Sequence, residues 1–406
     1  MKRMHWTMLL FIVLLSAVVA YADDQPQLSI SASKGGFLLT SPDGDFVLKI
    51  RGYIQSDGRF FLQDQPSAID TFTLRRVRPV FEGVIYKIFA FKLMPDFGGG
   101  TTVIQDAYMD AMFHPAFNLR FGKEKGPVGM ERLQSARDIV FVERSLATNL
   151  VPNRDIGIHV YGNLAGDKVT YDAAVQNGVV DAGSNDADSG SSKDAVGRIV
   201  FRPIQGLTVG IGGSTGQPEG TLLVPQLPNY KTSGQQTFFK YRLGLTLDTT
   251  TIADGDRTRY SPQATYYHGP VGILAEYVVS SQKVRFGLNS ADIRNKAWNL
   301  TVQGALTGEP EGFTGLSPKN PFDVSAGHWG AFEVAARYDE LDIDNDAFPI
   351  FADPLSSATK AKNWTVGLNW YFNKNFKWVF NYDQTSFDGG NLPTEKLFLT
   401  RFQVAF

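Results

Sequence analysis

The sequence predicts an all-β fold: a transmembrane antiparallel β-barrel of about 16 strands. Three observations lead to this prediction. The N-terminus resembles an export signal, long stretches alternate between apolar and polar residues, and the chain ends in Phe406 after such an alternating stretch.

The first 22 residues have the organisation of a Sec-type signal peptide. Lys2 and Arg3 precede an almost wholly apolar stretch at residues 8–20, and Ala20-Tyr21-Ala22 fits an A-x-A cleavage site. The apolar stretch is too short and wrongly flanked for a spanning helix, although an uncleaved anchor is the alternative. We therefore expect a signal peptide at residues 1–22, cleaved after Ala22, and a barrel domain at residues 23–406.

The composition of the mature chain excludes several functional classes. Removing the signal peptide leaves 384 residues with 37 Lys and Arg against 41 Asp and Glu, a formal charge of about −4. This balance gives no electrostatic support for binding nucleic acid. The chain has no cysteine, so it has no disulfide, thiol nucleophile or thiolate metal site. The four mature histidines are scattered without spacing for a metal or a catalytic triad, so we expect no metal, no cofactor and no catalytic residue.

No segment after the signal peptide is apolar enough to predict a spanning helix, which needs about 18 consecutive apolar residues. Aromatic residues nevertheless make up 13% of the chain, with 30 Phe, 15 Tyr and 40 Gly. This mixture fits apolar surface that is spread over alternating strands. A soluble exported β-sandwich has a similar composition, so composition alone leaves both folds open.

Alternation with a period of two predicts strands with one dry face and one wet face. The clearest examples lie at residues 46–55, 239–248, 363–372 and 376–383, where apolar and polar side chains interleave. Weaker alternation lies at residues 117–121, 155–162, 168–176, 197–202, 271–279, 298–305 and 332–339.

Two features favour lipid over a protein core as the partner of the apolar faces. Large aromatic residues gather at the ends of the apolar sets, as they do in the girdles of membrane barrels, with Trp364 and Trp378 as examples. The connections also alternate between tight turns, such as residues 373–375, and long polar loops, such as residues 177–194 and 218–236. A mature chain of 384 residues provides 24 residues for each of about 16 strands, and barrels of ~16–18 strands enclose a water-filled channel. Residues 23–40 form a polar lead-in, that is, a polar segment ahead of the first predicted barrel strand. The sequence leaves open whether this segment lies in the periplasm.

Seven stretches resemble the phosphate-selective porin O/P family of outer-membrane channels, and they occur in family order along nearly the whole mature chain. They are FVLKIRGYIQ (46–55), LRRVRPVFEG (74–83), NLRFGK (118–123), VERSL (142–146), LTGEP (306–310), ARYDE (336–340) and VGLNWY (366–371). The last residue, Phe406, is similar to the terminal aromatic signal that bacterial barrels present to their assembly machinery. The resemblance implies a homotrimer in the outer membrane of a Gram-negative-type bacterium, embedded in lipid and passed by small anionic solutes.

Residues 122–154 contain no clean strand, which makes this segment the best candidate for a loop that folds into the barrel. The resemblance implies that this third loop narrows the pore with basic and hydroxyl side chains. The residues that match those positions are Arg132, Ser135, Arg137 and Arg144. A solvated loop with internal salt bridges is the alternative, because exposed charge is ordinary.

The resemblance places further pore-lining residues on the predicted strands. They are Arg75, Arg76, Arg78, Asp106 and Lys377, with Lys92 as a substitute for a family lysine that falls on Ala90. Regular pleating puts Arg76 and Arg78 on one face and Arg75 on the other, unless the strand bulges there. Lys240 and Arg242 are expected on the lumenal face of the strand at residues 239–248.

The function expected from this reading is passive diffusion of small solutes, with anions such as phosphate favoured. A channel of the same fold for pyrophosphate, a sugar or an organic anion is the alternative, and a barrel lipase is a further one. The Gly-rich stretch at residues 210–216 is followed by Pro218, so we interpret it as strand and turn and not as a phosphate loop. The acidic run at residues 181–194 lacks ordered calcium-ligand spacing, and we interpret it as a solvated external loop.

Overall fold

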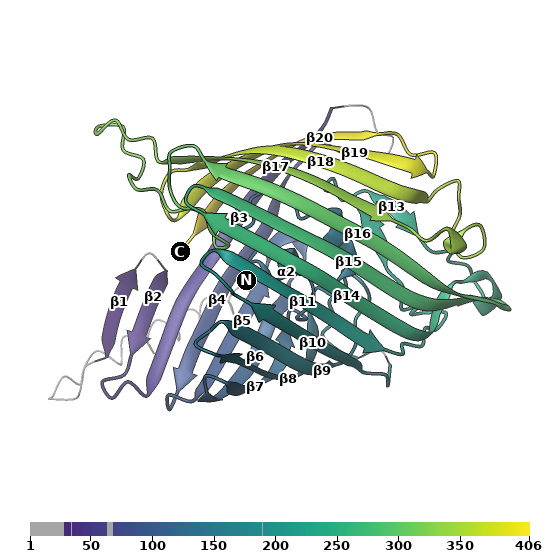
Figure 1. Ribbon diagram of the computed structural model, residues 1–406, viewed down its shortest axis with the longest axis horizontal. Helices are drawn as coiled ribbons and strands as arrows, with labels where there is room; N and C mark the ends of the chain where they lie inside the picture. Colours follow the sequence, from purple (N-terminus) through teal and green to yellow (C-terminus); the bar gives the residue numbers. More distant parts are fainter. Residues whose placement is uncertain (1–27, 34, 63–67, 189) are drawn as a thin grey trace, which may run out of the picture.

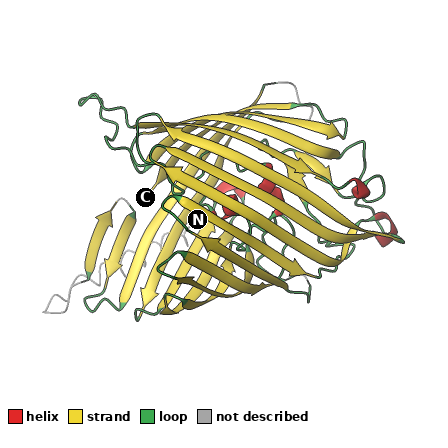
Figure 2. Cartoon of the chain, in the orientation of Figure 1, coloured by secondary structure: helices red, strands yellow, loops and turns green. Residues whose placement is uncertain are grey.

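The computed structural model describes residues 28–33, 35–62, 68–188 and 190–406. The predicted signal peptide at residues 1–22 lies outside the described residues. Strands dominate the described part, and its helices are single short turns (Figure 2). Within these residues, no helix is long and apolar enough to cross a membrane.

Sixteen antiparallel strands form a closed barrel, as the sequence predicts (Figure 1). Each strand pairs with the next along the chain, and the last pairs with the first of the ring, so that no edge is left open. The strands are β3 (Phe46–Phe61), β4 (Thr71–Ile85), β5 (Phe89–Asp96), β6 (Val103–His114), β7 (Phe117–Glu124), β8 (Asp155–Leu164), β9 (Val169–Gln176), β10 (Asp194–Phe201), β11 (Leu207–Gly216), β14 (Ile252–His268), β15 (Val271–Phe286), β16 (Asn289–Ala305), β17 (Ala331–Asp342), β18 (Ala358–Tyr371), β19 (Phe376–Gly389) and β20 (Glu395–Ala405).

A hairpin precedes the barrel and extends its sheet. It consists of β1 (Ser29–Ser33) and β2 (Gly36–Thr40), and β2 pairs with the first residues of β3. The later part of β3 pairs with β20, so β2 and β20 share the same side of β3 in succession. The described part of the predicted lead-in is therefore a β-hairpin, which stands beside β3 at the end of the barrel where the C-terminus lies (Figure 1).

The two faces of the strands differ as predicted. On β19, Lys377, Asn381 and Asp383 are buried inside the barrel, whereas Trp378 is 37% exposed on the outside. On β18, Trp364 is exposed in the same way. The outer face is apolar and aromatic and the inner face is polar, which is the pattern of a membrane barrel.

The two ends of the barrel carry different connections. The end that holds Phe406 has mostly short turns, such as residues 86–88 and 372–375, and we call it the turn end. The opposite end, the loop end, carries most of the long connections, such as residues 177–193 and 217–251. Two connections reverse this habit: residues 306–330 form a long connection at the turn end, and residues 287–288 form a tight turn at the loop end.

The predicted strand at residues 239–248 is wrong, and so is the placement of Lys240 and Arg242 on the lumenal barrel wall. This segment belongs to the loop between β11 and β14, where β12 (Asn229–Lys231) and β13 (Thr237–Lys240) form a separate two-stranded sheet. Lys240 is exposed, and Arg242 donates to the carbonyl of Pro349 in another loop. The aromatic residues that alternation assigned to lipid are instead buried against protein, in a cluster with the neighbouring loops: Phe239 and Tyr241 pack with Tyr230, Phe348 and Leu150.

The acidic run at residues 181–194 is also not wholly solvated. Asp181 accepts from the guanidinium of Arg259, and Asp194 accepts from Arg257 and Arg259, with all four side chains buried. These pairs attach both ends of the run to the lumenal face of β14. The Gly-rich stretch at residues 210–216 lies within β11, which confirms the interpretation as a strand.

The closing seam of the barrel contains a buried ion pair. Arg401 of β20 lies directly opposite Asp57 of β3, and its Nε and Nη2 atoms donate to the two carboxylate oxygens at 2.7 and 2.6 Å. The side chains are 1% and 3% exposed. The chain then ends with Phe406, whose backbone N–H and C=O both pair with Gly52. A bidentate pair of this geometry fixes the register of the seam.

We expect the Arg401→Gln variant to lose about 3–5 kcal/mol of stability, because it leaves the Asp57 carboxylate buried without its partner. Urea-induced unfolding in lipid vesicles, followed by tryptophan fluorescence, measures this loss. Lys362→Gln is the matched control, since the Lys362–Asp388 pair is largely exposed and contributes at most about 1 kcal/mol. Equal unfolding midpoints for the two variants would contradict a stabilising role of the seam pair.

Candidate pore constriction

A long loop crosses the inside of the barrel, and we call it the inner loop (residues 125–154, between β7 and β8). It contains α2 (Met130–Leu133) and η2 (Leu146–Leu150), and Figure 1 places α2 within the ring of strands. Most of its side chains are buried. This confirms the predicted inward fold for residues 125–154, whereas residues 122–124 of the predicted segment belong to β7.

Polar side chains of the opposite barrel wall hold the backbone of the inner loop. The Asn381 side-chain oxygen accepts from the Val142 N–H at 2.7 Å, and the Asn369 amide donates to the Val140 carbonyl at 2.9 Å. Further contacts come from β15 and β17. The Glu276 carboxylate accepts from the N–H groups of Met130 and Glu131, the Asp339 carboxylate accepts from the Leu146 N–H, and Arg337 donates to the Glu143 carbonyl. An irregular backbone inside a barrel needs such partners, because unpaired buried peptide groups are destabilising.

Lys377 points into the lumen, as the sequence predicts, but its ammonium group is not free. It donates to the Ile139 carbonyl at 3.1 Å and lies 5.6 Å from the ring centre of Tyr371. Its side chain is 4% exposed. Lys377 therefore attaches the inner loop to the wall as well as contributing positive charge beneath it.

The inner loop lies between two cavities. A cavity of about 540 Å³ opens toward the turn end, and one of about 510 Å³ opens toward the loop end. The predicted residues divide between them. Arg78, Lys92, Asp106, Ser135 and Arg137 line the turn-end cavity, whereas Arg75, Arg76, Arg132 and Arg144 line the loop-end cavity.

Arg75 and Arg76 both face the lumen, because β4 bulges between them. Gln55 pairs with Arg76, but the next residue of β3 pairs with Leu74, which leaves Arg75 without a partner in the register. Arg75 Nε lies 2.6 Å from the Glu143 carboxylate, and Arg76 Nη2 lies 3.8 Å from it. Burial opposes ionisation of Glu143, but the two guanidinium groups hold the pKa of this carboxyl well below its ordinary value.

Arg78 and Asp106 are each held by an ion pair in the turn-end cavity. Arg78 donates to Asp96 at 2.7 Å and to the Tyr53 hydroxyl at 2.8 Å. Asp106 accepts from Lys92 at 2.9 Å and from Arg154 at 2.8 Å. Arg154 is not among the pore residues predicted from the sequence. It lies just before β8, where no sequence pattern indicates a role in the pore, and only the fold brings it to Asp106.

The basic residues of the inner loop contrast with these paired residues. Lys125 Nζ and Arg144 Nη2 donate to the same carbonyl, that of Gln134, at 2.8 and 2.7 Å, and Arg132 Nη2 donates to the Thr148 carbonyl at 2.6 Å. Among the described residues, no carboxylate oxygen lies within 4.0 Å of any of the three cationic groups. We call Lys125, Arg132 and Arg144 the unpaired cluster.

Burial and mutual repulsion act together on the unpaired cluster. Burial is the larger cause, and together with Arg144 and Arg154 it lowers the pKa of Arg132 to about 9 and brings the pKa of Lys125 well below its usual range. The two guanidinium groups of the cluster stay charged at neutral pH, because arginine does not lose its proton there. Positive charge without an ion-pair partner is therefore concentrated where the inner loop separates the two cavities, and low-dielectric walls focus its field.

Ser135 and Arg137 lie at the turn-end side of the inner loop. The Ser135 hydroxyl oxygen lies 3.4 Å from the Arg137 N–H, which donates to it, and the Arg137 guanidinium contacts Asp138 at 3.1 Å. The Arg137 side chain is 32% exposed, so it can still reach a solute. Arg137 also lines a third cavity together with Lys377.

Comparisons with known proteins agree with this fold. The model of the family described as "Phosphate-selective porin O and P" matches residues 48–406. Porin O of Pseudomonas aeruginosa is 25% identical over 413 residues, covering 92% of each chain. Among solved structures, the outer membrane channel DcaP of Acinetobacter baumannii superposes with a TM-score of 0.60 at 11% identity, covering 92% of this chain and 100% of that one. The anion-selective porin from Comamonas acidovorans gives a TM-score of 0.55 at 12% identity, covering 89% and 100%.

We expect the double variant Asn369→Ala/Asn381→Ala to loosen the inner loop, because it leaves the Val140 carbonyl and the Val142 N–H without their partners. Each lost buried partner costs about 1–3 kcal/mol. Single-channel conductance should rise, and larger solutes should enter proteoliposomes in a swelling assay. Gln384→Ala, on the outer face of β19, is the control and should leave both readouts unchanged. Unchanged conductance and size exclusion in the double variant would contradict this role of the wall amides.

Proposed function

Because the chain belongs to the phosphate-selective porin O and P family, we propose that it conducts small anions, phosphate among them, by passive diffusion. The chain is an outer-membrane porin and not an enzyme. The proposal concerns the selectivity of the channel, the residues that produce this selectivity, and the assembly of the channel.

The unpaired cluster is the observation that supports anion selection. Most charged side chains inside the barrel are matched by a partner of opposite sign, as Arg78 is by Asp96 and Arg75 by Glu143. Lys125, Arg132 and Arg144 have no such partner among the described residues and lie between the two cavities. Rings of positive charge in a confined lumen favour anions, and guanidinium forks match phosphate oxygens.

Planar-bilayer recording tests the proposal directly. The purified protein should give stepwise conductance, and the reversal potential in a salt gradient should show a preference for anions. A cation preference would contradict anion selection. Absence of conductance from correctly folded protein would contradict the channel itself.

We expect the double variant Arg132→Gln/Arg137→Gln to weaken the preference for anions. A unit charge about 10 Å away stabilises a permeating anion by ~0.4 kcal/mol in water and destabilises a cation equally, so the anion-to-cation permeability ratio should fall about fourfold for each charge removed. The matched control is Lys240→Gln/Arg242→Gln, which removes the same charge from the loop between β11 and β14. Equal reversal potentials for the two double variants would mean that the inner loop does not control selectivity.

Phosphate as the preferred anion has a separate test. Phosphate should block the chloride current of the purified channel at micromolar concentration, since the guanidinium groups of Arg132 and Arg144 can bind its oxygens. Chloride current that persists unchanged at millimolar phosphate would point to another solute of the same pore, such as pyrophosphate or an organic anion.

The proposal includes export by the Sec pathway, assembly through Phe406 and a trimeric state. The chain ends with an alternating strand whose final aromatic residue is 38% exposed on the outer face of the barrel, where the assembly machinery can bind it. OmpT of Vibrio cholerae, which has the same fold with a TM-score of 0.55, has been solved in a trimer form. Native mass spectrometry in detergent measures the number of chains in this assembly.

We expect the mature protein to begin at Asp23. The small residues at Ala20 and Ala22 fit the cleavage site, so Ala22→Arg should block processing and retain the 22-residue extension. Tyr21→Phe is the control and should be processed normally. Intact mass of the membrane-extracted protein distinguishes the forms, and a mature start at another residue would contradict the predicted site.

A further inference from the structure

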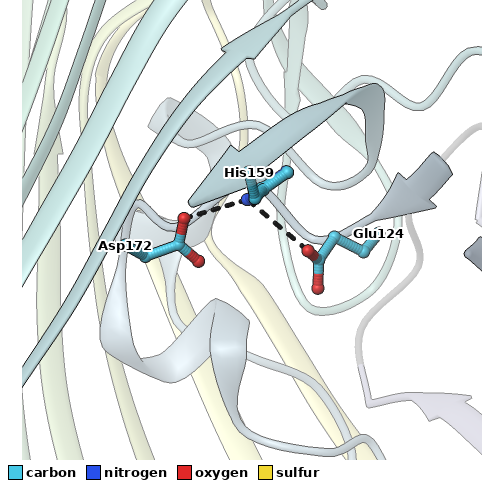
Figure 3. A group of neighbouring side chains, drawn as sticks. All are labelled: Glu124, His159 and Asp172. Carbon is cyan, nitrogen blue, oxygen red and sulfur yellow. Dashed lines mark hydrogen bonds and ion pairs between the residues drawn. The ribbon is translucent and has the colours of Figure 1, made fainter. Parts of the chain in front are cut away.

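We propose that Glu124, His159 and Asp172 bind a divalent transition-metal ion of the Zn²⁺ type on the wall of the turn-end cavity. The three residues lie on the adjacent strands β7, β8 and β9, and their side chains converge on one point (Figure 3). Their separation in the sequence gives no metal-binding motif. Pairing of the strands brings them together.

The geometry is close to that of a metal site. His159 Nδ1 lies 2.9 Å from an Asp172 oxygen and 3.5 Å from a Glu124 oxygen, and the three ligand atoms all lie within 4.8 Å of one another. Zinc bonds to nitrogen and oxygen of about 2.0–2.2 Å place tetrahedral ligand atoms roughly 3.3–3.6 Å apart. Displacements of the ligand atoms by less than about 1 Å, produced by side-chain rotation, would give this arrangement. Both carboxylates already point to the same nitrogen of the imidazole (Figure 3).

An unpartnered atom points to the same place. Glu124 Oε2 accepts from Arg120 Nη1 at 2.5 Å, but Glu124 Oε1 is buried and has no hydrogen-bond partner. A buried carboxylate oxygen without a partner is unusual in a folded protein and calls for an explanation. This oxygen faces His159 at a distance too long for a good hydrogen bond and suited to a shared metal ion.

Neighbouring side chains are arranged as supports for the three ligands. The Gln176 amide nitrogen lies 3.1 Å from His159 Nε2, the ring nitrogen that faces away from the carboxylates. With a metal ion on Nδ1, Nε2 would carry the proton and, after the Gln176 amide turns over, would donate to its oxygen, as is usual for metal-bound histidines. Arg120 also forms a bidentate pair with Asp110, which fixes the guanidinium that orients Glu124.

The local charge favours a dication. Asp110, Glu124 and Asp172 bring three negative charges, and Arg120 is the one cation that forms an ion pair with them among the described residues. Arg198, opposite Asp172 on β10, faces the group without an ion pair and donates to Gln263. With a neutral imidazole the group keeps net negative charge, which a metal ion would neutralise.

The ligand types indicate which metal ion fits. One imidazole with two carboxylates suits Zn²⁺ and related transition metals, whereas Ca²⁺ and Mg²⁺ prefer sites made of oxygen alone. Glu124 and Asp172 line the turn-end cavity, so an ion can reach them from the lumen and keep a water molecule as a fourth ligand. The proposal does not depend on anion selection by the inner loop.

Isothermal titration of the purified, metal-free protein in detergent with ZnCl₂ tests the proposal. We expect one Zn²⁺ per chain, and an affinity lower by about 100-fold or more in His159→Gln, since even the loss of a supporting residue costs about 10–100-fold. MgCl₂ should give no comparable binding. His268→Gln is the matched control: it removes an exposed histidine from the turn end of β14 and should leave zinc binding unchanged.

Asp172→Asn serves as a second variant, because it keeps the size of the side chain and a hydrogen-bond acceptor for His159. It should also lose zinc binding, so it decides the matter if His159→Gln does not fold. Zinc binding that is absent at about 1 mM, or equal in the unaltered protein and in a folded His159→Gln or Asp172→Asn variant, would overturn the proposal. Either result would mean that the three side chains are held together by a protonated His159 between two carboxylates.

Discussion

The structure depends on one constraint: every backbone N–H and C=O at membrane depth must find a partner within the protein. The sixteen strands meet this constraint only because β20 pairs with β3 and closes the ring. The seam carries the bidentate Arg401–Asp57 pair, and the last residue of the chain pairs its backbone with Gly52. Closure also creates a lumen wide enough for a 30-residue loop, and the same constraint then applies to that loop. Its irregular backbone is satisfied by wall side chains such as Asn369, Asn381 and Asp339, so the polar inner face does more than line a pore.

These polar contacts determine which charges are available to a solute. Arg78 is neutralised by Asp96, whereas Lys377 donates to the neutral Ile139 carbonyl and keeps its charge. Glu143 balances Arg75 and Arg76 at the bulge of β4. The unpaired cluster differs from these ion pairs because Lys125, Arg132 and Arg144, like Lys377, donate to neutral groups, which orient the side chains without cancelling their charge. Carbonyl oxygens thus fix the cations in place while leaving their field directed into the lumen.

Much of the fold could be predicted from the sequence, because alternation along β18 and β19 is long and regular and a membrane barrel has a simple topology. The inward direction of Lys377 followed from its neighbours Phe376 and Trp378, and the inner loop followed from the absence of strands at residues 122–154. Other features depend on partners that no local pattern reveals. Residues 239–248 alternate as a lipid-facing strand does, yet Phe239 and Tyr241 bury the same apolar face against other loops. Arg75 faces inward only because the register shifts at Ser56, and Asp181 and Asp194 are buried only because β14 places Arg257 and Arg259 beside them.

The charge of the whole chain is therefore a poor guide to the charge that a solute meets. The chain has a formal net charge of −2, and composition alone would not favour anions. In the structure, many acidic side chains of the lumen are matched by a basic partner, such as Asp57 by Arg401 and Asp194 by Arg257. Paired charges largely cancel at a distance, whereas unpaired ones do not. Under the proposed function, selectivity depends on the basic groups without an ion pair where the inner loop separates the two cavities and confines the path of the solute. A barrel can for this reason be negative overall and still present a positive constriction.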